Sequence, residues 1–234
     1  VKHGHWKDSS ILLRGAAVWS LTVFFLSTWG YVKNVDEDFS KYRMEYLPQD
    51  AAGGVAQPYY DSPLDGEQVG ENVYFNMVAR AKRYVYIETP YLILDNEMCT
   101  ALCNAAKQGV DVQIVVPHIG DHWYVHAMTR SNYARLTECG VRIYEYTPGF
   151  IHSKIFVCDD ELCVVGTINL DYRSLYLHFE NAVLLYKMPV IADIVQDFHD
   201  IVAVSHQVTH QECLDTPWYR RMGRAIIKIF APLM

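Results

Sequence analysis

The chain has 234 residues, 51% of them hydrophobic and 20% charged, which is enough for one folded domain with additional segments. Its net charge of −7 provides no overall basic field for nucleic acid, although a local basic groove is compatible with this charge. The cysteines form no C-x2-C pair, so we expect reduced core residues in a cytosol-facing protein at Cys99, Cys103, Cys139, Cys158, Cys163 and Cys213.

The first 33 residues combine a possible strand, 6–13, with an uncharged stretch, 15–32. This length is at the lower limit for a membrane-spanning helix. Serine, threonine and glycine dilute its hydrophobicity, so we expect a buried helix instead. Residues 34–54 are polar and end in two glycines, which is typical of a linker or a mobile loop.

Strands and helices alternate after residue 55, where a new domain is expected to begin. Apolar runs predict strands at 84–88, 112–116, 141–146 and 182–186. Amphipathic stretches predict helices at 70–81, 96–108, 121–139 and 190–206. This alternation is typical of an α/β protein in which helices cover both faces of a mixed, mostly parallel sheet.

The most informative stretch is 151–181, which has His152, Lys154 and Asp159 in the spacing H-x-K-x4-D. Two apolar runs around Asp159 predict a hairpin with strands at 155–158 and 162–165. Residues two apart share a face of a strand, so His152 and Lys154 should point the same way. Thr167 and Asn169 should do so too if the chain stays extended. Asp159 has the opposite parity, so we expect it off the reacting face in a structural role.

These side chains suit a bound phosphate. Histidine can attack phosphorus or exchange a proton. Lys154 can neutralise phosphate oxygens, while Thr167 and Asn169 can donate hydrogen bonds to them. The alternative is a β-hairpin that holds a histidine and a lysine by chance. It does not account for the run G-T-x-N-x-D-x-R-S, which begins at Gly166.

The stretch resembles the HKD motif of the phospholipase D superfamily, with its trailing box and a glutamate, here Glu180. The resemblance implies a phospholipase D-like α/β/α sandwich and a two-step phosphoryl transfer without a metal ion or cofactor. One histidine forms a phosphohistidine, and a second histidine from another copy of the motif protonates the leaving alcohol. The resemblance also implies that Glu180 holds a histidine in the correct tautomer. Taken alone, Glu180 would be interpreted as a surface charge.

Within this superfamily, the chain resembles the C-terminal half of a bacterial cardiolipin synthase. The resemblance rests on the G-x-W-x-D start, on T-P-Y at 89–91 and on G-V-x-I-Y-E-Y-x-P-G-F-x-H-x-K from Gly140. It implies that 1–33 is the trailing part of a first HKD half, 34–54 a linker and 55–215 the second HKD domain. The other histidine would come from that first half or from a second copy of the chain.

The reaction implied is transfer of a phosphatidyl group from one phosphatidylglycerol to another, with release of glycerol. It would take place at the cytoplasm-facing surface of a bacterial cell membrane, and no nucleic acid is expected as a partner. The implied catalytic set is His152, Lys154, Asp159, Asn169 and Glu180. Thr167 would assist at the phosphate.

Two tyrosines and one polar cluster are further candidates. Tyr91 and Tyr146 lie at predicted strand ends, where they either contact the lipid or fill the core. Asp121, His122 and His126 have metal-ligand spacing, but no partner carboxylate or cysteine is suitably spaced. We therefore favour a substrate-rim or surface role for the cluster over metal binding, because α/β sites lie in loops after strand carboxyl ends.

The C-terminal tail, 216–234, has only basic charges, and its apolar and aromatic residues recur at near-helical spacing. Such a helix suits an anionic membrane surface. A helix docked on its own domain is the alternative. The basic residues are Arg220, Arg221, Arg224 and Lys228.

Two other functions remain open. One is a homodimeric phospholipase D-like phosphodiesterase that hydrolyses lipid or nucleic acid, against which the acidic charge and the tail argue. The other is an inactive fragment that docks to a partner half or to a membrane, which the intact HKD motif does not exclude.

Overall fold

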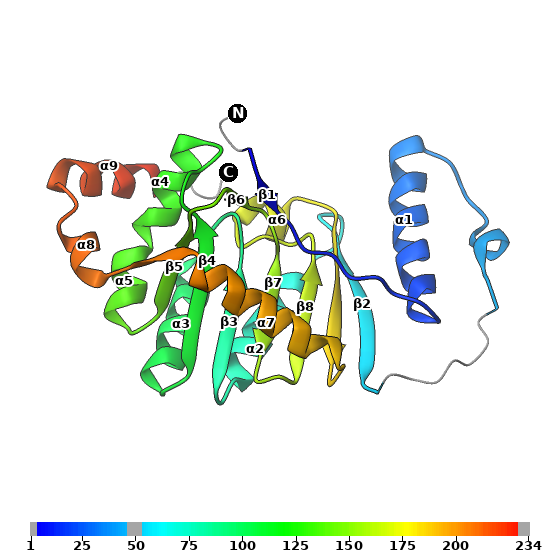
Figure 1. Ribbon diagram of the computed structural model, residues 1–234. Helices are drawn as coiled ribbons and strands as arrows, with labels where there is room; N and C mark the ends of the chain where they lie inside the picture. Colours follow the sequence, from blue (N-terminus) through cyan, green and yellow to red (C-terminus); the bar gives the residue numbers. More distant parts are fainter. Residues whose placement is uncertain (1–3, 46–52, 229–234) are drawn as a thin grey trace.

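A mixed eight-stranded sheet forms the centre of the computed structural model, which describes residues 4–45 and 53–228 (Figure 1). The strand order is β10-β5-β4-β3-β7-β8-β9-β2. In chain order, these strands are β2 (Val55–Asp61), β3 (Tyr84–Glu88), β4 (Asp111–Pro117), β5 (Arg142–Tyr146), β7 (Ile155–Cys158), β8 (Leu162–Gly166), β9 (Glu180–Tyr186) and β10 (Ser205–Val208). A separate two-stranded ladder joins β1 (Trp6–Lys7) to β6 (Phe150–Ile151).

The pairing of the strands corrects one expectation. Only β3–β4 and β4–β5 are parallel in the described sheet. The other five neighbouring pairs are antiparallel. The predicted α/β architecture with a mixed sheet is confirmed, but "mostly parallel" is wrong. A tight hairpin reverses the chain between β7 and β8, and β9, β2 and β10 also pair antiparallel to their neighbours, so the parallel part is limited to β3, β4 and β5.

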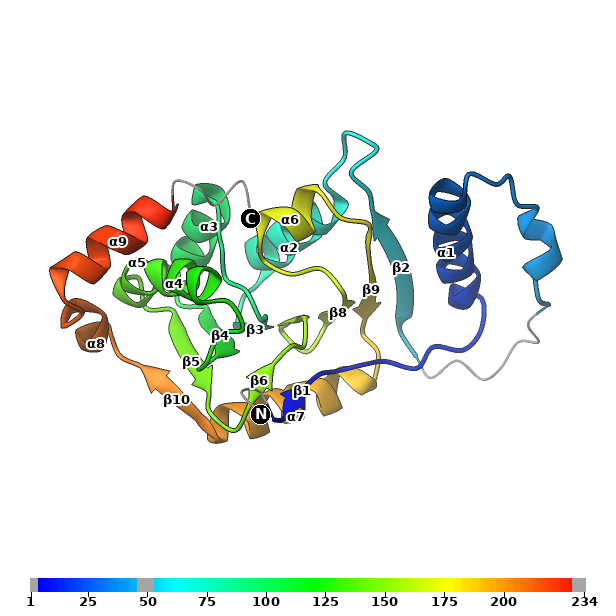
Figure 2. The same cartoon turned by 90° about the horizontal axis from the view of Figure 1, so that it is seen from above.

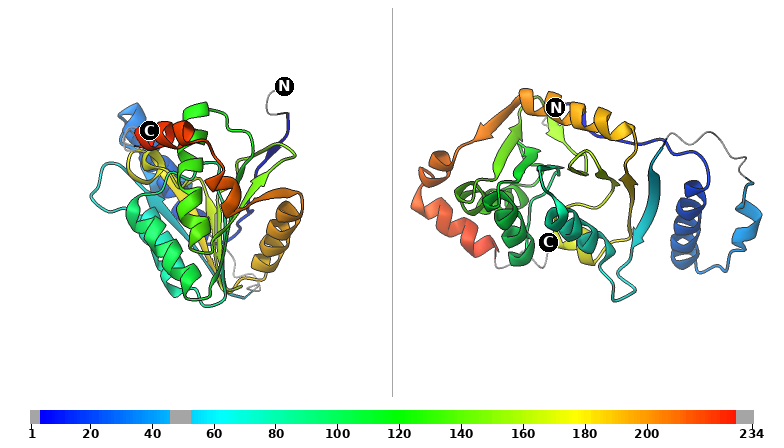
Figure 3. Two further views of the ribbon diagram at one scale, coloured as in Figure 1. Left: turned by 90° about the vertical axis from the view of Figure 1, so that its left-hand side faces the viewer. Right: turned by 90° about the horizontal axis from the view of Figure 1, so that it is seen from below.

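Helices cover both faces of the sheet, as the end-on view in Figure 3 shows. One face packs against α2 (Val69–Arg80), α3 (Asn96–Lys107) and α5 (Tyr133–Glu138), and the other against α7 (Val190–Ala203). Strand β3 illustrates the cause. Its Val85 and Ile87 belong to the first apolar cluster, while Tyr84 and Tyr86 belong to the second. Alternate residues of a strand face opposite sides, so an all-apolar strand requires cover on both.

Two predicted helices differ from those observed. The helix expected over 121–139 is divided into α4 (Trp123–Ser131) and α5. Asn132 lies at the break, where its buried side-chain amide donates to the carbonyl oxygen of Leu92 at 2.9 Å. The helix expected over 190–206 ends at Ala203, and the chain continues as β10. The remaining short helices are α6 (Tyr172–Tyr176), α8 (His210–Leu214) and the tail helix α9 (Trp218–Lys228).

The N-terminal segment lies at one edge of the sheet. Helix α1 (Ala17–Lys33) stands beside β2, and the short helix η1 (Phe39–Tyr42) follows it (Figures 1 and 2). Leu26 is the only residue of α1 that is fully buried, so the expected buried helix is not found within this chain. None of the helices in the described ranges has the length and hydrophobicity that crossing a bilayer requires. The predicted linker falls partly outside the described residues. All six cysteines are free thiols; four are buried in the core, whereas Cys139 and Cys213 are only half-buried.

Candidate active site

The HKD residues lie beyond the carboxyl end of β3. Strand β7 runs antiparallel to β3, with Ile155 opposite Glu88 and Cys158 opposite Val85. His152 and Lys154 precede β7, so the register brings them to the edge at which β3, β4 and β5 end. Ligands of open α/β sheets bind at this edge.

Lys154 lies directly against His152, as their shared parity predicts. The Lys154 ammonium is 3.0 Å from each ring nitrogen of His152 and donates to the His152 carbonyl oxygen at 2.5 Å. Lys154 is only 8% exposed, and this burial lowers its pKa to about 8, against the opposing effect of Asp8, Glu180 and Asp171. A cation with little access to water gains strongly from an incoming phosphate.

The N-terminal strand supplies a carboxylate to this site. Strand β1 pairs in parallel with β6, and the His152 amide donates to the Lys7 carbonyl oxygen at 2.7 Å. This places an Asp8 carboxylate oxygen 3.1 Å from Nδ1 of His152, while the Trp6 ring meets the imidazole edge-on at 5.2 Å. A carboxylate at Nδ1 favours the tautomer with the hydrogen on Nδ1, which leaves the lone pair on Nε2. In the sequence, Asp8 stands out only as part of the G-x-W-x-D resemblance, and no local pattern indicates a role for it.

Glu180 is part of a separate buried network. Thr167 donates its hydroxyl hydrogen to one Glu180 oxygen, and Ser174 donates to the other at 2.8 Å. The imidazole beside Glu180 is that of His178, at 3.5 Å. No contact between Glu180 and His152 is found within the described residues; Asp8 holds that ring. Thr167 therefore uses its hydroxyl inside the protein, and Glu180 is buried rather than a surface charge.

Asn169 is fixed beside the segment that follows β3. The Tyr74 hydroxyl donates to the Ile168 carbonyl oxygen at 2.9 Å, and a bridge joins Leu92 to Leu170. The backbone N–H of Asn169 donates to the Ser174 hydroxyl oxygen at 2.8 Å. The side-chain oxygen of Asn169 is buried and has no hydrogen-bond partner among the described residues. A buried polar atom of this kind marks a position where a ligand can complete the bonding.

Asp159 has a structural position, but strand parity is not the reason: it follows the end of β7, in a turn with a left-handed backbone (φ 57°). Its carboxylate accepts backbone N–H groups of Lys82, Arg83 and Tyr84 at 2.7, 2.8 and 2.9 Å. Burial opposes ionisation of Asp159, but these three donors lower the pKa of its carboxyl overall. Asp159 therefore anchors the amino end of β3, at the opposite end of β7 from His152.

A buried acid beneath the motif was missed by the sequence analysis. Glu88 is 1% exposed, and one of its oxygens accepts a hydrogen bond from Ser153, the residue between His152 and Lys154. Its other oxygen has no partner among the described residues. Burial raises the pKa of Glu88 to about 7. The strand pattern around Glu88 gave no signal, because a charged last residue of a strand is usually at the surface.

A pocket of about 360 Å³ adjoins Asn169. Tyr91 lines it and donates its hydroxyl to Asp121 at 2.7 Å, so the predicted rim position of Tyr91 agrees with the structure. Tyr146 is instead buried in the second apolar cluster, where it fills the core. The lining residues are Tyr91, Ile93, His122, Tyr124, Val125, Asn169, Asp171, Arg173 and His178. The described residues contain no group of three or more metal-ligating side chains, at Asp121, His122 and His126 or elsewhere.

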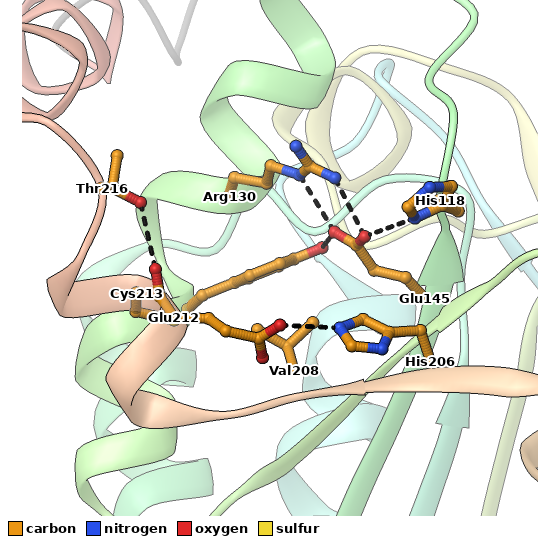
Figure 4. A pocket seen from close by; sticks show the side chains of 9 residues that line it. His118, Arg130, Glu145, His206, Val208, Glu212, Cys213 and Thr216 are labelled. Atoms are coloured by element: carbon orange, nitrogen blue, oxygen red, sulfur yellow. Dashed lines mark hydrogen bonds and ion pairs between the residues drawn. The ribbon is translucent and has the colours of Figure 1, made fainter.

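A second cavity, of about 260 Å³, lies near the β10 edge of the sheet (Figure 4). Glu145 accepts two hydrogen bonds from Arg130, each 2.9 Å long, and one of its carboxylate oxygens lies 2.8 Å from Nδ1 of His118. Burial opposes ionisation of Glu145, but these partners lower its pKa overall. His206 contacts Glu212 of α8 at 3.0 Å. The charges are matched within the protein, so we interpret the cluster as a structural connection between the sheet edge and the tail.

One side of the tail helix α9 packs against the domain, and its other side is exposed to solvent. Ile227 packs against the small cluster around Ile93 and Met128, so one side of α9 is held on the domain. Its other side leaves four large apolar residues exposed: Trp218, Tyr219, Met222 and Ile226. The side chains of Arg221, Arg224 and Lys228 lie outside the described residues. The two interpretations of the tail are therefore compatible.

Comparison with known proteins gives consistent results. Residues 74–202 match the family model described as "Cardiolipin synthase, PLD-like domain". The chain is 32% identical to a cardiolipin synthase of Halalkalibacterium halodurans over 99% of its own length and 46% of that protein. It is 44% identical to an uncharacterized protein of Streptococcus mutans, over all of this chain and 50% of that protein. The chain thus spans about half the length of these relatives.

Among solved structures, Nuc of Salmonella typhimurium, a phospholipase D family member, superposes with a TM-score of 0.58 at 19% identity. The match covers 67% of this chain and 99% of Nuc, and it supports the fold.

Proposed function

We propose that this chain, which belongs to the phospholipase D-like domain family of cardiolipin synthases, is one half of an enzyme that transfers a phosphatidyl group between two phosphatidylglycerol molecules. The observation on which the proposal rests is the group formed by Asp8, His152 and Lys154. It combines an oriented imidazole with a buried ammonium at 3.0 Å. Such a group suits attack on, or proton exchange at, a phosphodiester.

The chemistry needs two imidazoles and two steps. In the first, one imidazole nitrogen attacks phosphorus, the bond from phosphorus to the glycerol oxygen breaks, and glycerol takes a proton from the other imidazole. In the second, the hydroxyl of another phosphatidylglycerol attacks phosphorus and the phosphorus–nitrogen bond breaks. The proton of that hydroxyl passes to the second imidazole. His152 fills either role, since its contacts suit both.

Negative charge develops on the phosphate oxygens in both steps. Lys154 supplies a cation within a buried site, where an electrostatic interaction is stronger than in water. We assign the Asn169 side-chain NH2 as a hydrogen-bond donor to the same phosphate; its oxygen, which has no partner among the described residues, can only accept. We assign positioning roles to Thr167, Glu180 and Asp159, which bind within the protein.

The second imidazole comes from another HKD motif, because H-x-K-x4-D occurs once in this sequence. We propose the first HKD half of the same protein as its source, with a second copy of this chain as the alternative. Helix α1 supports a packing partner: its apolar residues Phe25 and Val32 are 64% and 66% exposed. A single copy of this chain, purified as a monomer, is then expected to make no cardiolipin.

The test is His152→Ala in the complete enzyme, with cardiolipin measured by mass spectrometry. A loss of about 10³-fold or more is expected with the fold intact by circular dichroism. His199→Ala is the matched control, since His199 is exposed on α7. Normal turnover of His152→Ala would remove the proposal.

We also propose that the enzyme works at an anionic membrane surface on the cytoplasmic side. The exposed apolar residues of α9 and its basic sequence support this location, because interfacial helices combine the two.

A further inference from the structure

The pocket beside Asn169 contains groups that the two-step chemistry does not use. Asn169 contributes one wall, so the pocket opens next to the phosphate site. Its volume of about 360 Å³ is within the range of small-molecule sites. Asp171, another lining residue, lies close enough to Lys154 to act on its pKa. A charged group of the pocket therefore lies close enough to the proposed reaction centre to affect the pKa of Lys154.

The charged groups of the pocket are not all paired with one another. His178 lies 3.5 Å from Glu180 and also near Asp171. Asp171 is buried and accepts the Ser174 amide hydrogen at 2.9 Å. Arg173 differs from these residues: it is exposed, and no hydrogen bond or ion pair engages its guanidinium within the described residues. An arginine fork with open donors is suited to a phosphate.

We propose that Arg173 and this pocket bind the phosphodiester of the acceptor phosphatidylglycerol. The inference rests on the proposed transferase function and adds the position of the second lipid.

The chemistry of the product explains why such a subsite is needed. Cardiolipin holds two phosphates joined by one glycerol, so the acceptor's phosphate must lie near the reacting phosphorus while its terminal hydroxyl attacks. Two phosphates repel each other, and Lys154 is already engaged by the first. A second cation is therefore required within the span of one glycerol. Arg173 lines the same pocket as Asn169, so it is the cation that the proposal places there.

The remaining lining residues suit the rest of the acceptor. Ile93, Val125 and Tyr124 provide an apolar wall that reduces access of water, which competes with the acceptor for the phosphohistidine. The Tyr91–Asp121 pair provides polar groups for a glycerol hydroxyl. Arg173 takes no part in bond making; it binds the acceptor while that lipid's hydroxyl attacks phosphorus, the phosphorus–nitrogen bond breaks and the proton passes to the second imidazole.

The test measures how the phosphatidyl-enzyme divides between two acceptors. The complete enzyme is supplied with phosphatidylglycerol in phosphatidylcholine vesicles that contain ethanol. Cardiolipin and phosphatidylethanol are then quantified together. Arg173→Gln should lower the ratio of cardiolipin to phosphatidylethanol by about 10- to 100-fold, because only the lipid acceptor has a phosphate to bind. Arg173→Lys should restore part of the ratio, since it keeps the charge without the fork.

Arg80→Gln is the matched control. It makes the same charge change at an exposed site on α2, at the amino end of β3. Its product ratio should equal that of the wild type. An unchanged ratio in Arg173→Gln, or an equal fall of both products, would overturn the acceptor subsite. A wild-type enzyme that forms neither product would instead contradict the proposed transferase function, so the two failures are distinguishable.

Discussion

The carboxylate of Asp8 lies 3.1 Å from Nδ1 of His152, although 144 positions separate the two residues in sequence. The contact depends on the β1–β6 ladder, in which Lys7 is paired with Ile151. The imidazole of His152 is thus oriented by a strand that lies 144 positions earlier in the sequence.

Asp8→Asn should lower cardiolipin formation by about 10²- to 10⁴-fold, because the amide neither fixes the tautomer nor stabilises an imidazolium. Steady-state rates by mass spectrometry check this, and thermal unfolding checks that the fold persists. Asp36→Asn, at an exposed position after α1, serves as control and should leave the rate of cardiolipin formation unchanged. Comparable rates for the two variants would show that Asp8 has no part in orienting His152.

Activity should decline as the pH rises above about 8. The pKa of Lys154 is lowered to about 8 by burial, so the free enzyme loses its phosphate-binding cation in that range. The decline should appear in kcat/KM, which reports the free enzyme. Arg stays charged at these pH values, so Lys154→Arg should shift the fall to higher pH even if its rate is lower. The same alkaline midpoint in both enzymes would exclude Lys154 as its source.

Glu88→Gln should change the pH dependence of stability. Burial raises the pKa of Glu88 from 4.5 to about 7, so the unfolded chain loses this proton first as the pH rises. Glu88 contributes its full share of folding stability below pH 4.5, and this contribution is lost as the pH rises through 7. Between pH 5 and pH 8, wild type should lose about 2 to 3 kcal/mol of unfolding free energy relative to Glu88→Gln. Urea unfolding at both pH values measures this, with the exposed Glu67→Gln as control; parallel pH profiles would contradict it.

Chelators should leave the transfer reaction intact. In the proposed reaction, Lys154 and Asn169 supply the charge and hydrogen bonds that a metal ion would otherwise provide to phosphate. Cardiolipin formation should be equal with and without EDTA. Activity that disappears in EDTA and returns with a stoichiometric metal would implicate Asp121, His122 and His126 instead.

Replacing the tail's basic residues with glutamine should weaken binding to anionic vesicles by about 1 kcal/mol per charge at low salt. Co-sedimentation with phosphatidylglycerol vesicles measures the change, and added salt should reduce wild-type binding in the same way. Trp218→Ser tests the apolar contribution separately, since Trp218 is exposed. Binding that ignores both charge and salt would indicate that α9 serves only as a docked helix. The residues to replace are Arg220, Arg221, Arg224 and Lys228.

Local patterns were sufficient for much of the fold. Strand β3 has the predicted bounds, since an apolar run is followed by Thr89 and Pro90, and proline lacks the N–H that a strand needs. Asp159 was expected away from the reacting groups, and it lies in the turn that polar residues after the apolar run 155–158 predict. Both conclusions depend only on neighbours in sequence.

Features that depend on distant residues could not be predicted. Asn132 interrupts a helix because its amide bonds to Leu92, which no helical periodicity reveals. Strand β10 is short and half-exposed, and it exists because β5 offers an edge. The partner of His152 is Asp8 rather than Glu180 because of the β1–β6 pairing. Tyr146 fills the core because alternate residues of β5 face α7.

The spacing between Lys154 and Asp159 has a consequence for how the motif can vary. The four residues between them are the whole of β7, Ile155–Cys158, so the motif spans the sheet from its reacting edge to its anchored edge. Four strand residues extend about 13 Å. One inserted or deleted residue would either shift the pairing of β7 with β3, which turns Lys154 to the other face, or move Asp159 away from the backbone N–H groups that it accepts. The x4 in H-x-K-x4-D is therefore a strand length set by the width of the sheet, and single-residue insertions or deletions there should abolish both activity and the Asp159 anchor together.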